Sequence, residues 1–122
     1  MKLVILDTNF ILTCVKQKID FFEEIHFMDL KIIVPKQVIR ELEKFSKSKK
    51  RTIKFQADLA LKILRSNRPE IIDLKESGVD QGIIKFAKKN PDIILATLDS
   101  ELKNSVKNQK LIIRGKKRLQ VI

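Results

Sequence analysis

Four acidic side chains are the best candidates in this sequence for metal-assisted chemistry: Asp7, Glu41, Asp80 and Asp99. Asp7 directly follows the apolar run 3–6, and Asp99 comes just after a strand that is predicted over 93–97. Short, fully apolar runs of this kind predict strands buried on both faces of a parallel sheet. The carboxyl ends of such strands meet at one edge, where open α/β sheets bind their ligands. We therefore expect both carboxylates at that edge.

Helical periodicity places the other two acidic residues. At 3.6 residues per turn, Asp80 falls in the apolar half of a helix predicted over 79–89, beside Ile83 and Ile84. A carboxylate turned toward a core is costly unless something compensates it. Glu41 borders the apolar stripe of a helix expected to begin near Pro35, and this helix starts at the carboxyl edge of the preceding strand. Both side chains are thus expected to reach the same edge.

Ordinary structural roles are the alternative explanation for each acidic residue taken singly. Asp7 and Asp99 precede predicted helices, and Asp is a favourable N-cap. Asp80 stands three residues after Ser77, which is the spacing of a capping box. Glu41 could be a boundary residue of its helix. These roles explain single positions but not the convergence of four carboxylates.

A hard divalent cation accounts for the four together. Converging carboxylates repel one another, and neither Asp7 nor Asp99 has Lys or Arg next to it in the sequence. Mg²⁺ or Mn²⁺ prefers carboxylate oxygens and keeps several waters, and such ions activate water for phosphodiester hydrolysis. We expect Asp7, Asp80 and Asp99 to be metal ligands. His26 is the only histidine, so neither a histidine metal site nor a histidine-based ribonuclease is expected.

The charge balance favours a polyanionic partner. Lys and Arg number 26 against 15 Asp and Glu, a formal net charge of +11. Nucleic acid binds such surfaces through counterion release. A segment expected to contact RNA lies between two predicted helices and comprises Lys47, Lys49, Lys50, Arg51 and Lys54. A second cluster comprises Arg114, Lys116, Lys117 and Arg118. Both clusters could also be simply solvated.

Strands and helices alternate along the 122 residues, which are expected to form one domain, 1–122. This order predicts a three-layer α/β/α domain with a mainly parallel central sheet. Phe55 is expected on the apolar side of a helix over 50–64, and with no Trp or Tyr in the chain no base-stacking platform is expected. No apolar run approaches the ~20 residues of a membrane span, and no secretion signal is recognised, so a cytoplasmic protein without membrane contact is expected.

Four segments in order resemble the PIN-domain ribonuclease family, including archaeal members. They are LVILDTN at 3–9, VIREL at 38–42, GVDQGII at 78–84 and ATLDSEL at 96–102; IRGKK at 113–117 is also similar. The resemblance implies a PIN-like fold and a metal-dependent endoribonuclease that prefers single-stranded RNA and often forms homodimers. It also implies that the catalytic set comprises Asp7, Glu41, Asp80 and Asp99.

The same family includes VapC-type toxins, which bind an antitoxin protein, and ribosomal RNA-processing enzymes; the sequence leaves this choice open. On this resemblance Asn9 and Thr97 would orient ligands or waters, although both could be cap or turn residues. Gln81 is a departure, because many relatives carry a second acidic residue there. It predicts a weakened second metal site.

Other functions fit less well. A phospho-accepting receiver domain needs an acidic pair after its first strand, and Asp7 has no acidic neighbour. A haloacid-dehalogenase-type phosphatase needs Asp two residues after Asp7, where Asn9 stands. The main alternative is a non-catalytic RNA-binding scaffold, which the four acidic residues disfavour and Gln81 favours.

Overall fold

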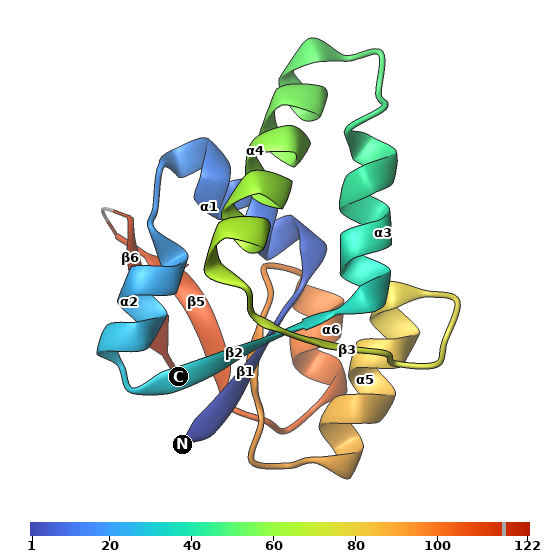
Figure 1. Ribbon diagram of the computed structural model, residues 1–122. Coiled ribbons are helices and arrows are strands. Elements are labelled where there is room, and N and C mark those ends of the chain that lie inside the picture. The colour runs from blue at the N-terminus through green and yellow to red at the C-terminus, as the bar shows by residue number, and fades with distance from the viewer. Residues whose placement is uncertain (116) are drawn as a thin grey trace.

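A computed structural model describes residues 1–115 and 117–122. One six-stranded sheet has the order β3-β2-β1-β4-β5-β6 (Figure 1). Its strands are β1 (Lys2–Leu6), β2 (Leu30–Pro35), β3 (Glu70–Ile72), β4 (Ile94–Ala96), β5 (Lys110–Arg114) and β6 (Arg118–Val121). The helices are α1 (Thr8–Gln17), α2 (Phe21–Phe27), α3 (Lys36–Phe45), α4 (Arg51–Asn67), α5 (Val79–Lys89) and α6 (Ser100–Ser105).

The sheet is parallel except for its last strand. β1 pairs in parallel with β2 on one side and with β4 on the other, while β5 and β6 form an antiparallel hairpin. The chain moves outward from β1 to β2 and β3, and then returns to the other side of β1 with β4. The carboxyl ends of β1 and β4 therefore flank the topological switch point, where α/β sheets open a crevice.

Helices cover both faces of the sheet because successive strand residues point to opposite sides. Val4 and Leu6 pack in a core with residues of α1, α2, α3 and α4. Ile5 points the other way, into a core with Ile83 of α5 and Leu102 of α6. The predicted three-layer α/β/α architecture is confirmed. Cys14 is buried in the first core as a free thiol, and burial raises its pKa to about 12.

Helices α3 and α4 form a hairpin that projects beyond the carboxyl edge of the sheet (Figure 1). The buried face of α4 in this hairpin includes Ala57, Ala60 and Leu64. Phe55 lies two residues before Ala57 and so points about 160° away around the helix. The expectation that Phe55 faces the core is wrong: its side chain is 68% exposed.

Asn108 fastens the end of α5 to the sheet. The carbonyl oxygens of Ala87, Asn90 and Ile93 lie 3.1, 3.0 and 2.9 Å from its Nδ2, whose two hydrogens are shared among these three acceptors. The side chain is buried, so these contacts replace water for carbonyls at a helix end and the start of β4. No helix in the described ranges is long and apolar enough to span a membrane.

Replacing Asn108 with Ala should therefore destabilise the fold. Several carbonyls that now accept from its amide would be left without a buried donor, at a cost of about 1–3 kcal/mol. Chemical denaturation of purified protein measures this, with Asn104→Ala as control, because Asn104 is exposed on α6. Equal free energies of unfolding for the two variants would contradict the anchoring role.

Candidate active site

The first carboxylate, Asp7, is buried at the switch point between β1 and β4. Thr97 Oγ1, just beyond β4, donates a hydrogen bond of 2.9 Å to Asp7 Oδ2. The backbone N–H of Thr8 donates to Asp7 Oδ1 at 2.8 Å, so Asp7 is also the N-cap of α1. The carboxylate is therefore fixed from two strands, and its role as a cap coexists with its place at the predicted edge.

The surroundings of Asp7 oppose its negative charge. The pKa of Asp7 is raised to about 6, chiefly by burial and to a smaller extent by the charges of Asp80 and Glu41, although the hydrogen bonds from Thr97 and Thr8 lower it. Asp7 is only 4% exposed. The structure thus places the predicted carboxylates of Glu41 and Asp80 within electrostatic reach of Asp7, where they disfavour its negative charge.

Asp99 lies just beyond Thr97 and is held by its backbone. Its N–H donates to Thr97 Oγ1 at 3.1 Å, so one threonine hydroxyl links the backbone of Asp99 to the carboxylate of Asp7. Asp99 Oδ1 accepts from the N–H groups of Glu101 and Leu102 and caps α6. In the described chain no hydrogen bond reaches Asp99 Oδ2.

Glu41 is half-buried on α3, and Asp80 is exposed in the first turn of α5. Among the residues described, neither carboxylate has a hydrogen bond or an ion pair from a side chain; the ion pairs there are Lys31–Glu70 and Lys85–Glu76. The expectation that Asp80 leans into the core is wrong, because its carboxylate reaches solvent and still acts on Asp7. The capping box with Ser77 does not form, since the N-cap of α5 is Gly78, without a side-chain cap.

Gln37 positions Asp80 indirectly, through the loop that precedes α5. The side chain of Gln37 is buried one turn before Glu41 on α3. Its Nε2 donates to Asp73 Oδ1 and to the carbonyl of Glu76, and its Oε1 accepts from the N–H of Leu74. Gln37 therefore holds the loop that leads into α5. A polar residue four positions before a candidate catalytic Glu is the one signal that could have revealed it.

Gly82 lets this loop pack closely on α5. A Cβ atom at Gly82 would lie 2.8 and 2.9 Å from Cδ1 and Cβ of Leu74, closer than carbon atoms approach. The glycine thus fixes the distance between the loop and the helix that carries Asp80. Gly78, by contrast, has open space around it.

The fit of a divalent cation follows from this set of donors. All four candidate side chains offer carboxylate oxygen, which suits Mg²⁺ or Mn²⁺. The hydroxyl of Thr8, next to Asp7, is fully buried and has no hydrogen-bond partner in the described chain, so it can still bond a further polar group. Nowhere in residues 1–115 and 117–122 do three acidic, histidine or cysteine side chains form a ready-made cage. Mg²⁺ commonly needs only one or two carboxylates beside its waters, so the donors fit.

The remaining predicted residues lie around this centre. Asn9 is exposed in the first turn of α1, and Gln81 is exposed beside Asp80. The predicted RNA-binding segment occupies the tip of the α3–α4 hairpin, and all of its side chains are exposed: Lys47, Lys49, Lys50, Arg51 and Lys54. In the second cluster Arg114, Lys117 and Arg118 are exposed at the β5–β6 turn, and Lys116 lies outside the described residues.

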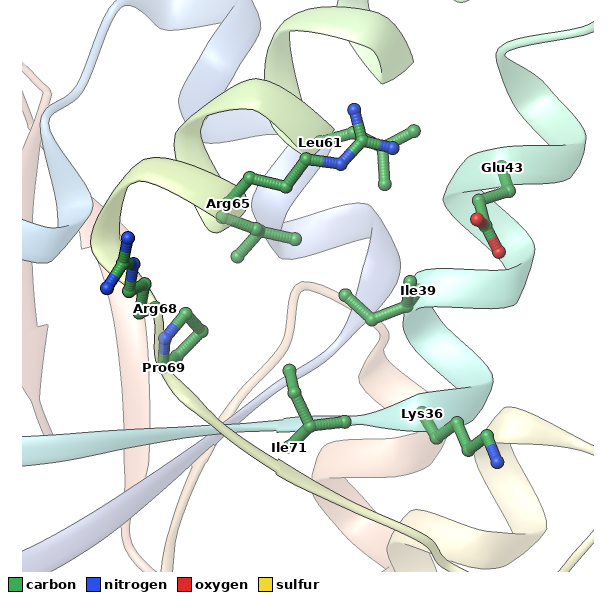
Figure 2. A pocket seen from close by; sticks show the side chains of 9 residues that line it. Lys36, Ile39, Glu43, Leu61, Arg65, Arg68, Pro69 and Ile71 are labelled. Atoms are coloured by element: carbon green, nitrogen blue, oxygen red, sulfur yellow. The ribbon is translucent and has the colours of Figure 1, made fainter.

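A separate cavity of about 380 Å³ lies between α3, α4 and β3 (Figure 2). Apolar side chains, among them Ile39, Leu61 and Ile71, line its interior, and the side chain of Arg65 extends toward it from α4. Arg68, at the end of α4, also contributes to the lining. None of the four candidate carboxylates lines it. The acidic centre and this apolar groove are therefore different features of the surface.

The fold is a small three-layer α/β/α domain with candidate carboxylates at one edge of its sheet, and comparison with known proteins identifies the family. The profile of the PIN like domain family matches residues 4–117, so this chain belongs to that family. Ribonuclease VapC4 of Methanocaldococcus jannaschii is 28% identical over 124 aligned residues, which cover 97% of this chain and 95% of that protein.

Solved structures are similar as well. The PIN domain endonuclease Utp24 superposes with a TM-score of 0.80 at 26% identity, covering 98% of this chain and 92% of that one. A structure of VapBC2 from Rickettsia felis, bound to a DNA fragment from its promoter, shares the fold alone, with a TM-score of 0.54 and 18% identity over 88% and 98% of the two chains.

The burial of Asp7 predicts a pH-dependent cost in the metal-free protein. Its pKa rises from 3.8 when unfolded to about 6 when folded, so the native state holds the proton more tightly between these values. The free energy of unfolding should therefore fall as pH rises through that window, by roughly 3 kcal/mol at most. In EDTA, Asp7→Asn should be more stable than the native sequence at pH 8, with a difference that shrinks toward pH 4.

Thr97→Val should change the pH dependence of stability in the direction opposite to Asp7→Asn. Without the hydroxyl donor the carboxylate of Asp7 is less stable as an anion, so the stability of this variant should decline more with pH than that of the native sequence. Denaturation at several pH values measures all three proteins. A stability difference between Asp7→Asn and the native sequence that does not change with pH would contradict the account.

Proposed function

We propose that this protein is a metal-dependent endoribonuclease that cleaves single-stranded RNA by attack of water on a phosphodiester. The observation that carries the proposal is Asp7, a buried carboxylate that faces the charges of Glu41 and Asp80 at the switch point of the sheet. An arrangement this unfavourable to an anion is typical of a functional site. Membership of the PIN-like family and the names of two relatives, a ribonuclease and an endonuclease, support the same activity.

Asp7, Asp80 and Asp99 would hold Mg²⁺ or Mn²⁺, and Glu41 would complete the set. A bound ion lowers the pKa of its water and neutralises charge on the phosphate. Thr97 orients Asp7 and, through the backbone of Asp99, keeps the two aspartates in register. Glu41 and Asp80 are accessible enough to accept a proton from the attacking water or to orient it. Asn9, at the first turn of α1, would orient a water or the substrate.

Exposed cations at the hairpin tip would bind the RNA backbone. Lys47, Lys49 and Lys50 lie on the turn between α3 and α4. Helix α4 has no acidic residue in its first turn, so the positive end of its dipole adds to their potential. On this proposal, the backbone of an RNA that is cut at the acidic centre would extend onto this cationic surface. An extended single strand can do so, because its backbone has no fixed helical shape.

The proposal extends to the oligomeric state of the protein and to its role in the cell. We propose that residues 1–122 act as one cytoplasmic domain and that it forms a homodimer. Two roles are consistent with its relatives: a VapC-type toxin restrained by an antitoxin protein, or an RNA-processing enzyme. The apolar groove of Figure 2, with Arg65 and Arg68 beside it, has the chemistry to receive an amphipathic segment of such a partner protein.

The second candidate function is an RNA-binding scaffold without catalysis. Gln81 favours this scaffold, because many members of the family carry an acidic residue directly after the position of Asp80, where this chain has an amide. A neutral side chain there leaves fewer ligands for a second ion. The buried and repelled charge of Asp7 argues against it, because a binding scaffold gains nothing from that cost.

Cleavage of a labelled single-stranded RNA tests the activity. Cutting should require Mg²⁺ or Mn²⁺, stop in EDTA, and fall by at least about a hundredfold in Asp99→Asn, since even residues behind metal ligands are worth about 10–100-fold. Asn is as good an N-cap as Asp, so α6 should keep its start. Asp92→Asn is the matched control, because Asp92 is exposed before β4 at the opposite edge. Tight RNA binding without cutting in either metal would support the scaffold.

The salt dependence of binding tests the hairpin tip. Replacing Lys49 and Lys50 together with Gln should weaken binding to single-stranded RNA. The plot of log affinity against log salt should flatten by about 0.7 for each phosphate that the variant no longer neutralises. The same double change at Lys88 and Lys89, at the far end of α5, removes equal charge from the opposite edge. Equal effects of the two double variants would show that net charge alone matters.

A further inference from the structure

Phe55 is an exposed aromatic ring beside the exposed cations of the hairpin tip. Of the large apolar side chains that are exposed in the described ranges, two are aromatic, Phe27 and Phe55. Phe27 ends α2, a helix that carries Glu23 and Glu24. Phe55 instead lies one turn into α4, with 68% of its surface open to solvent.

The neighbours of Phe55 are exposed cations. Arg51 lies one helical turn before it on the same face, and Lys54 precedes it directly. The turn that leads into α4 adds Lys49 and Lys50. None of these cations takes part in an ion pair within the described part of the chain. Asp58 is the only acidic residue of α4, and it is half-buried.

An exposed apolar ring among these exposed cations is unfavourable in water, and a bound ligand could relieve both features. Exposure of an apolar ring of this size to water is unfavourable. The next buried positions along α4 are occupied by small residues, Ala57 and Ala60, and not by the ring. A second copy of this chain would cover the ring only by bringing its own net charge of +11 toward the same cations. A polyanion with flat apolar faces would both cover the ring and neutralise the neighbouring cations.

We propose that Phe55 is a stacking platform for an unpaired base of the RNA, with Arg51 and Lys54 holding the adjoining phosphates. Stacking on an aromatic ring contributes to binding for every base, so the site selects unpaired nucleotides and not a sequence. In a duplex the bases are stacked on one another and offer no free face. The inference rests on the proposed function for its substrate, and it places a point of contact on the hairpin, apart from the acidic centre.

The absence of Trp and Tyr makes a direct optical test available. Phe55→Trp introduces a single tryptophan, and its fluorescence should be quenched when oligouridylate of about 12 nucleotides is added in EDTA, because the indole stacks on a base. Phe27→Trp, exposed on α2, is the matched control and should keep its fluorescence. A tryptophan at Phe55 that is no more quenched than that control would overturn the proposal.

Affinity measurements separate stacking from charge. Phe55→Ala and Phe55→Leu should both weaken binding to the oligouridylate by about fivefold or more and leave binding to duplex RNA unchanged. Equal weakening on both RNAs, or none on either, would contradict stacking. A dimer of the native protein that dissociates in Phe55→Ala with no change in RNA affinity would assign the ring to a protein interface instead.

These tests are independent of cleavage because they are done in EDTA. Quenching and a selective decrease in single-strand affinity, in a protein that does not cut RNA with any divalent ion, would sustain the inference and refute the proposed enzyme. Metal-dependent cutting without quenching would support the proposed enzyme and refute the stacking role of Phe55.

Discussion

The hydrogen bond from Thr97 to Asp7 joins the two strands on which the acidic centre depends. Asp7 follows β1 and Thr97 follows β4, so this contact joins the ends of the two strands at the switch point of the sheet and fixes a buried carboxylate there. Burial in turn raises the pKa of Asp7, and the charges of Glu41 and Asp80 add to the cost. The fold accepts this cost because two large apolar cores, one on each face of the sheet, stabilise β1 and β4 around it.

The other parts of the centre are held by contacts that converge on the same edge. Gln37 ties the loop before α5 to α3, and Gly82 lets that loop lie against α5, so the positions of Asp80 and Glu41 depend on each other. Asp99 keeps one carboxylate oxygen on the end of α6 while its backbone follows Thr97. Regular elements thus carry each acidic side chain, and solvent reaches Glu41 and Asp80.

Sequence reasoning can predict the parts of this account that rest on local patterns. The apolar run before Asp7, the periodicity of 79–89 and the alternation of strands and helices are enough to predict the sheet and the edge at which the candidate carboxylates lie. They do not predict the environment of single side chains. Phe55 fits an apolar stripe on a helical wheel, yet the face of α4 that packs on the fold carries Ala57, Ala60, Leu61 and Leu64. Asp80 is exposed to solvent although its position on the wheel predicts a place near the core. The role of Gln37 depends on a loop that no periodicity describes.

If these carboxylates hold a divalent ion, Mn²⁺ should reveal its position, because Mn²⁺ broadens the NMR signals of nearby nuclei. Amide spectra of ¹⁵N-labelled protein, recorded while Mn²⁺ is added at less than one equivalent, should lose the signals of Asp7, Asp80 and Asp99 first, and excess Mg²⁺ should restore them. The signals of Asp92 and Lys88, at the opposite edge, should persist. Broadening centred on another acidic group, such as Glu43 and Asp58 on the hairpin, or spread evenly over the chain, would contradict the account.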